Sequence, residues 1–356
     1  MSHPQAVPGA HTLTEILSQP GCWRECLDVL HGGELDRVRK HIRDDAEWLF
    51  IGCGSSYYAA LAAAASWTAL TGSSAKAVPA SELLLFPDLV LGGKVDRQPV
   101  VISRSGRTSE ALRAAGMLES RFQMPTLAIS CAAEGPLEQI ASVTMRLSPA
   151  DESSTVMTRS FTSMLLGLQV LAATVGQKGS FSAALEGLRT PAQAALDGML
   201  ARIDDLVQRQ KFANYVFLAQ GPLYGLAAEG RLKVTEMSCS YAQAYHTLEF
   251  RHGPKSIVGP ESLLTFLISE SAYGAELEVL EEMKGYGATT LVVTNRAEER
   301  ARRCADLLLE LNLPVPELAR LGTYAFVGQL LGYYTGLHKN LDPDNPRNLS
   351  RVVVLE

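Results

Sequence analysis

The sequence lacks the cysteine patterns that mark metal sites and disulfide frameworks. Its six cysteines are scattered over 356 residues, and Cys22 and Cys26 have no second pair at metal-ligand spacing. The N-terminus carries no secretory signal, so we expect reduced thiols and a cytoplasmic protein. The sequence therefore predicts neither a bound metal nor disulfide bonds.

Basic clusters and long apolar runs are also missing. The net charge is −6 and the Lys and Arg residues are dispersed, so no cationic surface for a nucleic acid is expected. The longest apolar run, over 59–69, has about half the length of a membrane span. We therefore expect a soluble protein with no nucleic-acid or membrane partner.

Two common nucleotide-binding motifs are absent as well. The segment 52–54 has only two of the three glycines of a dinucleotide-binding turn, and no acidic residue ends the second expected strand at 75–79. The Walker A pattern does not occur. The sequence predicts no cofactor.

What is present is a pattern that occurs twice. An apolar strand, a glycine and an alanine-rich helix over 50–57 align with 217–224, at an offset of 167 residues. The segments 100–105 and 126–130 align in the same way with 266–271 and 290–294. The sequence therefore predicts an internal repeat.

Each copy alternates short apolar, β-branched runs with helical segments, which is typical of a parallel sheet covered on both faces. The predicted fold is α/β, with two tandem doubly wound parallel-sheet lobes of the flavodoxin or Rossmann kind. Gly179, Ser180 and Pro191 place the boundary around 180–205. Strands are expected near 47–52, 75–79, 98–103, 125–130, 142–147, 213–219, 263–269, 289–294 and 305–310, and helices near 56–70, 107–118, 161–177, 222–238, 272–286 and 317–338. The first eleven residues lack periodicity and are expected to form a loose tail.

Two hydroxyl-rich turns follow strands of the first copy. Gly54-Ser55-Ser56 follows the strand ending at Ile51, and Ser103–Thr108 follows the strand ending at Ile102. At the carboxyl edge of a parallel sheet, glycine, hydroxyl groups and a helix N-terminus together favour an anion. Alternatively, the same residues serve as ordinary helix N-caps.

Several motifs in order resemble the sugar isomerase (SIS) family, which includes the isomerase half of glucosamine-6-phosphate synthase and related amino-sugar-phosphate isomerases and deaminases. The resemblance covers nearly the whole chain from about residue 12. The motifs are Gly52-Cys53-Gly54-Ser55-Ser56-Tyr57, Ser103-Arg104-Ser105-Gly106-Arg107-Thr108, Thr158-Arg159-Ser160-Phe161-Thr162, Glu229-Gly230-Arg231-Leu232-Lys233-x-x-Glu236, His252-Gly253-Pro254 and Pro346-Arg347-Asn348-Leu349.

The resemblance implies a homodimer of two-lobed chains and a sugar phosphate ligand. It implies an N-terminal tail and helix over 1–34, a phosphosugar-binding lobe over 35–190, a second lobe over 200–345 and a tail over 346–356 that closes the active site. His252 would complete the partner's site, and Glu236 would be the base, with Glu229 and Lys233 beside it. The implied substrate contacts are Gly54, Ser55, Ser56, Ser103, Arg104, Ser105, Gly106, Thr108, Thr158 and Arg351.

Elementary chemistry is consistent with these roles. Interconversion of an aldose and a ketose needs a group near neutral pKa to open the ring and a carboxylate to move a proton between adjacent carbons. His252 and Glu236 are groups of these types, and helical spacing places Glu229, Lys233 and Glu236 on one face. Alternatively, the three form a solvated salt-bridge stripe and His252 is a surface histidine. His246 and His338 are interpreted as structural.

Three departures from the synthase pattern carry information. Arg104 and Arg107 stand where the synthase has Gln and Glu, which predicts a more cationic pocket. Arg351 stands where the synthase has a lysine that forms a Schiff base, and a guanidinium cannot form that imine. The glutamine amidotransferase domain of the synthase has no counterpart in this sequence.

The leading hypothesis is therefore an enzyme that converts a hexosamine 6-phosphate into a ketose 6-phosphate and ammonia. Two alternatives within enzymes are simple aldose–ketose isomerisation and cleavage of a sugar-amine phosphate conjugate. An alternative of another class is a non-catalytic sugar-phosphate sensor. The absence of a helix-turn-helix or basic extension weighs against the sensor.

Overall fold

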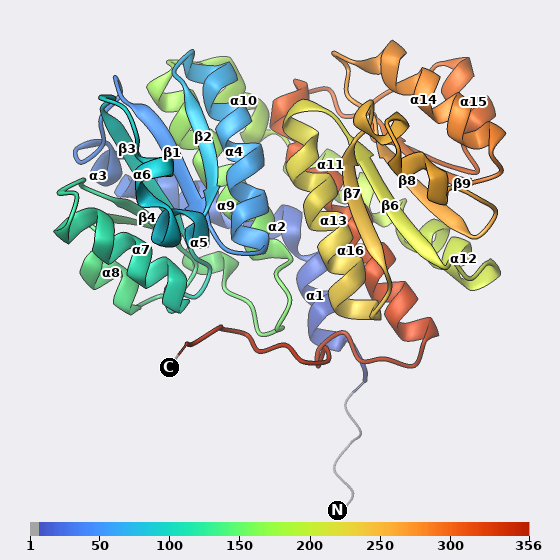
Figure 1. Cartoon of the computed structure of the whole chain (residues 1–356), viewed down its shortest axis with the longest axis horizontal. Coiled ribbons are helices and arrows are strands. Elements are labelled where there is room, and N and C mark those ends of the chain that lie inside the picture. The colour runs from blue at the N-terminus through green and yellow to red at the C-terminus, as the bar shows by residue number, and fades with distance from the viewer. Residues whose placement is uncertain (1–6, 356) are drawn as a thin grey trace, which may run out of the picture. The chain divides into compact units, whose positions relative to one another are not determined.

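A computed structural model describes residues 7–355 of the chain (Figure 1). These residues form two compact units. We call the unit made of Gln19–Glu152, Arg159–Arg189 and the residues from Ser350 onward lobe 1. The unit made of the residues up to Ser18, Ser153–Thr158 and Thr190–Leu349 is lobe 2. No helix within 7–355 combines the length and apolarity that crossing a bilayer requires.

Lobe 1 contains a parallel five-stranded sheet in the order β2-β1-β3-β4-β5. Its strands are β1 (Glu47–Gly52), β2 (Ala75–Pro79), β3 (Arg97–Ile102), β4 (Leu127–Ser130) and β5 (Val143–Arg146). Its helices are α2 (Gln19–Val29), α3 (Leu35–Arg39), α4 (Ser55–Thr71), α5 (Ala80–Leu85), α6 (Pro87–Val90), α7 (Ser109–Ser120), α8 (Pro136–Ile140), α9 (Arg159–Val175) and α10 (Gly179–Glu186).

Alternate residues of β1 face two different helical layers, as a doubly wound sheet requires. Leu49 and Ile51 lie in a buried cluster with residues of α5, α7 and α8. Trp48 points to the other face, where its ring stacks on Trp67 of α4 at 3.6 Å between ring centroids. Both faces of the strand are buried, which explains its continuous apolar sequence.

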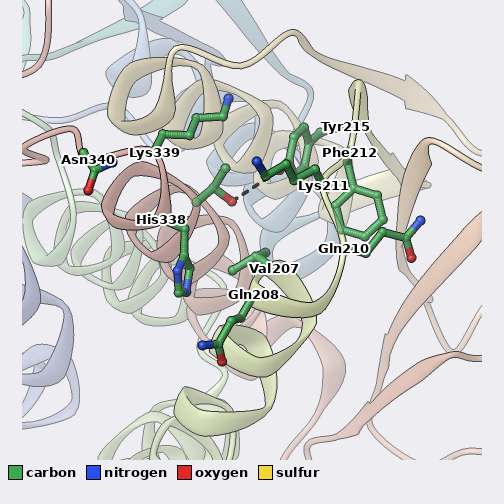
Figure 2. Close-up of a pocket in the computed structure, with 10 residues that line it drawn as sticks. Val207, Gln208, Gln210, Lys211, Phe212, Tyr215, His338, Lys339 and Asn340 are labelled. Atoms are coloured by element: carbon green, nitrogen blue, oxygen red, sulfur yellow. Dashed lines mark hydrogen bonds between the residues drawn. The ribbon is translucent and has the colours of Figure 1, made fainter.

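Lobe 2 repeats this strand order, as β7-β6-β8-β9-β10. Its strands are β6 (Asn214–Ala219), β7 (Ala242–His246), β8 (Ser262–Leu267), β9 (Thr289–Thr294) and β10 (Leu307–Glu310). Its helices are α1 (Ala10–Leu17), α12 (Leu200–Arg209), α13 (Tyr224–Ser238), α14 (Tyr273–Gly285), α15 (Glu299–Cys304) and α16 (Leu321–His338), and α11 (Arg189–Asp197) begins at the junction with lobe 1. A cavity opens where β6 begins and α16 ends (Figure 2). The predicted fold class is confirmed.

Helices α13 and α16 pack backbone to backbone because α16 carries a glycine on every fourth residue of one face. A Cβ atom at Gly328 would collide with the backbone of Gly230, and one at Gly336 would collide with the Met237 carbonyl. A Cβ at Gly332 would lie 2.5 Å from the carbonyl oxygen of Lys233. These glycines therefore set how closely α13 approaches its neighbour.

Several local features differ from the sequence expectation, which did not include the short helices α5, α6, α8 and α15. Strand β7 was not expected, because its sequence Ala-Gln-Ala-Tyr-His lacks the apolar, β-branched character of buried strands and it lies half-buried at the sheet edge. The loose tail was expected to reach residue 11, but α1 begins at Ala10. The N–H of Gly9 donates to Asp342 at 2.8 Å and that of His11 donates to Asp344 at 3.0 Å. Residues 1–6 of that expected tail lie outside the described residues.

Candidate functional site

The turn after β3 has its carbonyl groups tied into lobe 1. Gly106 adopts φ +60° and its N–H donates to the Ser103 carbonyl at 3.2 Å. The Arg104 carbonyl accepts from the N–H groups of Cys131 and Ala132 at 3.0 and 3.1 Å. Because these carbonyls are engaged within the lobe, an anion that approaches the turn does not meet them as free acceptors.

The hydroxyl groups of this turn do not act as helix caps. Thr108 is the N-cap residue of α7 but makes no side-chain capping hydrogen bond. The Ser103 side chain is only 3% exposed, and its Oγ has no hydrogen-bond partner among residues 7–355. Ser105 Oγ accepts from the N–H of Arg107 at 3.2 Å, and Arg107 itself is exposed. A buried hydroxyl without a partner is costly, so the ordinary capping role does not account for this turn.

The second hydroxyl-rich turn lies beside the first. Gly54 has φ +54° and is the N-cap of α4, and its carbonyl accepts from the N–H groups of Tyr57 and Tyr58 at 2.9 and 3.1 Å. Ser55 and Ser56 are buried in the first turn of α4. Because β1 and β3 are parallel neighbours, both turns lie at the carboxyl edge of the same sheet.

The matching turn of lobe 2 is filled by the chain's own carboxylates. The N–H and Oγ of Ser269 both donate to Glu276 Oε2 at 2.8 Å, and Thr247 Oγ1 donates to Glu276 Oε1 at 3.0 Å. The N–H of Glu270 donates to Glu317. Burial raises the pKa of Glu276, whose side chain is 1% exposed. An internal carboxylate in lobe 2 therefore binds the hydroxyl that corresponds to Ser103 Oγ, which is open in lobe 1.

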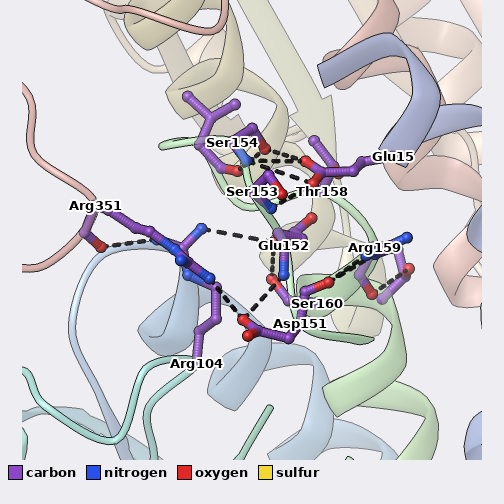
Figure 3. A network of polar contacts seen from close by, with 12 residues as sticks. Glu15, Arg104, Asp151, Glu152, Ser153, Ser154, Thr158, Arg159, Ser160 and Arg351 are labelled. Carbon is purple, nitrogen blue, oxygen red and sulfur yellow. Dashed lines mark hydrogen bonds and ion pairs between the residues drawn. The ribbon is translucent and has the colours of Figure 1, made fainter. Parts of the chain in front are cut away.

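Arg104 is engaged within lobe 1, and Figure 3 shows its contacts. Its Nη1 lies 3.6 Å from a carboxylate oxygen of the fully buried Glu152, and its Nη2 donates to the carbonyl of Arg351 at 2.7 Å. The Arg351 side chain in turn donates to Asp151 at 2.7 Å. The two arginines thus fasten the C-terminal segment to lobe 1. Their contact with a ligand stays a prediction.

Thr158 lies in a short segment that is held inside lobe 2. Its side chain is buried, and its carbonyl accepts from Gln329 Nε2 at 3.3 Å. The same segment begins with Ser153 and Ser154, whose N–H groups donate to the buried carboxylate of Glu15 on α1 (Figure 3). Sequence reasoning missed Glu15 because its partners lie more than 130 residues away.

Three ionisable side chains share the buried face of α13. Lys233 Nζ lies 3.3 Å from Glu229 Oε1 and 2.5 Å from Glu236 Oε2. Burial by itself lowers the pKa of Lys233, but the two carboxylates more than compensate, so its pKa is raised. The Glu229 and Lys233 side chains are each 1% exposed and that of Glu236 is 18% exposed. A stripe this deeply buried is not the solvated alternative.

His252 follows a 3-10 turn (Glu249–Arg251), and its side chain is exposed. Arg251 Nε and Lys255 Nζ, on either side of it, bind the two oxygens of Glu282 on α14 at 2.7 and 2.6 Å. Glu282 therefore anchors the loop that presents His252.

The remaining histidines of interest have other contacts. His246 stacks on Tyr224 at 3.9 Å between ring centroids, and burial lowers its pKa. His338 Nε2 lies 2.7 Å from Asp204. Among residues 7–355 no group of three His, Cys, Asp or Glu side chains is arranged to hold a metal ion.

Gln220 is a further polar residue that sequence reasoning missed. It directly follows β6, and its Oε1 is buried with no hydrogen-bond partner among residues 7–355. The carbonyl is thus an open acceptor at the carboxyl edge of the lobe 2 sheet. The signal that could have found it is its position, which matches that of Cys53 after β1.

The family model for the SIS domain matches residues 41–174 and 210–336. The chain belongs to the SIS domain family. Each matched segment contains the five strands of one sheet, so each lobe carries one SIS domain.

Relatives over most of the chain include a Streptomyces coelicolor protein named for D-galactosamine-6-phosphate deaminase activity (AgaS). It is 28% identical over 355 residues, which cover 94% of this chain and 91% of the relative. Glutamine–fructose-6-phosphate aminotransferase (isomerizing) of Shewanella oneidensis is also 28% identical, over 94% of this chain and 55% of its own length. This chain thus spans about half the length of these aminotransferases.

Solved structures resemble the whole chain. Glucosamine-6-phosphate deaminase from Thermotoga maritima has a TM-score of 0.79 at 26% identity, covering 97% of this chain and 100% of that one. Tagatose-6-phosphate ketose/aldose isomerase from Escherichia coli has a TM-score of 0.82 at 20% identity, covering 100% and 99%. The latter likeness concerns the fold alone.

Proposed function

We propose that this chain is an enzyme that converts a hexosamine 6-phosphate and water into a ketose 6-phosphate and ammonia. The observation that carries the proposal is the triad on α13, in which buried Lys233 is clamped between Glu229 and the more exposed Glu236. The deaminase names of the Streptomyces and Thermotoga relatives support it.

Phosphate binding is assigned to lobe 1. The turn after β3 offers the hydroxyl of Ser103, which has no protein partner among the described residues, and Gly106 lets the turn close at positive φ. The first turn of α4 adds hydroxyl groups and the positive end of a helix dipole. The residues proposed to hold the phosphate and sugar hydroxyls are Gly54, Ser55, Ser56, Ser103, Ser105, Gly106 and Thr108.

Proton transfer is assigned to lobe 2. His252 assists ring opening, which exposes the C1 aldehyde beside the amine on C2. Glu236 removes the proton from C2 and returns it to C1, while O1 gains a proton and the amine nitrogen loses one, so that C1 becomes an alcohol and C2 an imine. Water adds to C2, the C–N bond breaks and ammonia leaves. Lys233 binds the Glu236 carboxylate and positions it for the first step, and Glu229 balances the charge of Lys233.

A lysine Schiff base has no part in this scheme. Arg351 stands at the position where the synthase has its Schiff-base lysine. Its guanidinium does not form an imine and here binds Asp151. The scheme needs only proton transfer and water.

The alternative functions differ in the steps they use. Simple isomerisation uses the same proton transfer between C1 and C2 but breaks no C–N bond. Cleavage of a sugar-amine conjugate breaks a C–N bond without that proton transfer, and a sensor performs neither step.

One experiment separates these activities. The chain is incubated with hexosamine 6-phosphates and hexose 6-phosphates, and ketose and ammonia are followed by NMR. We expect both products from a hexosamine 6-phosphate, their loss in Glu236→Gln and their retention in Glu261→Gln, an exposed glutamate outside the triad. Ketose formed only from hexose phosphates, ammonia without ketose, or binding without turnover would each overturn the proposal.

A further inference from the structure

A cavity of about 550 Å³ lies within lobe 2, at the end of β6 opposite to Gln220 (Figure 2). It is formed by the end of α12, the start of β6 and the end of α16. The assigned phosphate turns lie in lobe 1, and Gln220 follows the opposite end of β6. The residues that line the cavity are Val207, Gln208, Gln210, Lys211, Phe212, Tyr215, Thr335, His338, Lys339 and Asn340.

The lining has cationic and neutral polar groups but no carboxylate. Lys211 and Lys339 supply two ammonium groups, and Gln208 and Asn340 supply exposed carboxamides. Phe212 and Tyr215 pack edge to face at 5.8 Å between ring centroids and form an apolar wall. The combination of an apolar wall with a few convergent polar groups is typical of small-molecule sites, and this volume lies in their usual range.

Two lining residues carry additional contacts that define the charge of the cavity. Lys339 Nζ donates to Ser240 Oγ at 2.7 Å and to the Ser238 carbonyl at 3.2 Å, and burial lowers its pKa. The Asp204 carboxylate, which is not part of the lining, binds His338 Nε2 at 2.7 Å. The charged groups of the lining itself are therefore basic.

We infer that this cavity is a second binding site, specific for a small organic phosphate. Lys211 and Lys339 pair with the phosphate, because two ammonium groups in the lining of one cavity suit a dianion. The carboxamides and the imidazole of His338 hydrogen-bond to the organic portion, which lies against the wall of Phe212 and Tyr215. Either a nucleoside monophosphate or a pentose phosphate has this chemistry.

The cavity adjoins the helix that carries the catalytic triad. Lys339 binds the carbonyl of Ser238, the last residue of α13. The helix that ends at His338, α16, touches the backbone of α13 at Lys233 through Gly332. A ligand that draws the Lys339 ammonium group away from Ser238 removes a hydrogen bond from the end of α13, so occupancy alters turnover. This regulatory step, unlike the binding itself, rests on the proposed function.

Binding is tested by calorimetry with adenosine 5′-monophosphate, ribose 5-phosphate and inorganic phosphate. We expect at least one of the two esters to bind, and to bind more tightly than inorganic phosphate. Lys211→Met/Lys339→Met weakens that binding by about tenfold or more, because two charge-assisted contacts are lost. Lys94→Met, an exposed lysine of lobe 1, leaves it unchanged. Tighter binding of the nucleotide identifies the nucleoside as part of the ligand, and equal binding identifies the phosphopentose alone.

Two additions keep the test decisive. Lys211→Glu changes only an exposed side chain and reverses its charge, so it replaces the double variant if that variant unfolds. Hydrogen exchange of segment 234–240 changes on ligand addition if Lys339 moves. The site is refuted if neither ester binds, or if binding is the same in the lysine variants. Binding that depends on the lysines in a chain without turnover supports the site and contradicts the proposed function.

Discussion

At the scale of single residues, Lys233 connects burial with chemistry. It is enclosed in lobe 2 with carboxylates on both sides, at 3.3 Å from Glu229 and 2.5 Å from Glu236. Its raised pKa means that this ion pairing stabilises the fold fully below the unfolded-state value near 10.5 and is lost as the pH rises through the folded-state pKa. The pairing is therefore intact throughout the neutral range.

Replacing Lys233 by methionine should damage both stability and turnover. The substitution leaves Glu229 buried without its cation, which costs about 3–5 kcal/mol of unfolding free energy, and removes the ammonium group that holds the Glu236 carboxylate in place. Urea unfolding at pH 7 and the rate of ammonia release measure the two effects. Turnover equal to the wild type in the folded variant would contradict the role of the triad.

Glu282 is expected to position His252 without contacting the substrate. Glu282→Ala removes the carboxylate shared by Arg251 and Lys255 and leaves Arg251 only its longer contact with Glu278 at 3.8 Å. The loop loses its main anchor, so we expect kcat to fall about tenfold with little change in phosphate affinity. The matched control is Glu281→Ala, the adjacent residue, which pairs instead with Arg300 at 2.8 Å. Partial recovery in Glu282→Gln supports positioning, and equal effects of the Glu281 and Glu282 alanine variants contradict it.

At the scale of elements, corresponding turns of the two lobes differ in what occupies them. Ser103→Ala should weaken phosphate binding several-fold and leave stability unchanged or raise it, since its Oγ is buried and has no protein partner among residues 7–355. Ser269→Ala should leave phosphate binding unchanged and lower stability by about 1–3 kcal/mol, because Glu276 loses a buried donor. Thermal unfolding and phosphate titration of both variants check these two expectations. Weaker phosphate binding in Ser269→Ala, with unchanged binding in Ser103→Ala, would contradict them.

The contact between α13 and α16 predicts a second effect at this scale. Gly332→Ala pushes a Cβ against the Lys233 carbonyl, which should cost about 1–3 kcal/mol as overpacking does and reduce turnover by displacing Lys233. Gly116→Ala is the matched control, because nothing lies within 4 Å of its Cβ position in α7. The control should gain up to about 1 kcal/mol. Denaturant unfolding distinguishes them, and a stabilised Gly332 variant would disprove the close packing.

At the scale of the whole molecule, we propose a homodimer in which His252 completes the partner's site. Chains with His252→Ala and chains with Glu236→Gln should each be inactive. Mixed dimers then contain one site with both residues intact and should regain up to about half of the wild-type activity per mixed dimer. Mixing is verified with differently tagged chains, and inactive mixed dimers would rule out a site shared between chains.

Much of the fold was predictable because its signals are local. The apolar runs of β1 and β3, the glycines at 54 and 106 and the helical spacing of Glu229, Lys233 and Glu236 all reflect period or backbone conformation within a few residues. The half-buried edge strand β7 carries no such signal and was missed. The clustering of the three α13 side chains followed from helical geometry alone.

The sequence by itself determined two α/β lobes, the positions of the hydroxyl-rich turns and the shared face of the α13 triad, because each follows from local periodicity. Only the tertiary structure decided that Ser103 Oγ is open while Ser269 is taken by Glu276, and that Arg104 is bound to Glu152. These outcomes depend on burial and on side chains brought together by folding. Similar turns therefore have different occupants, a distinction that a linear pattern does not contain.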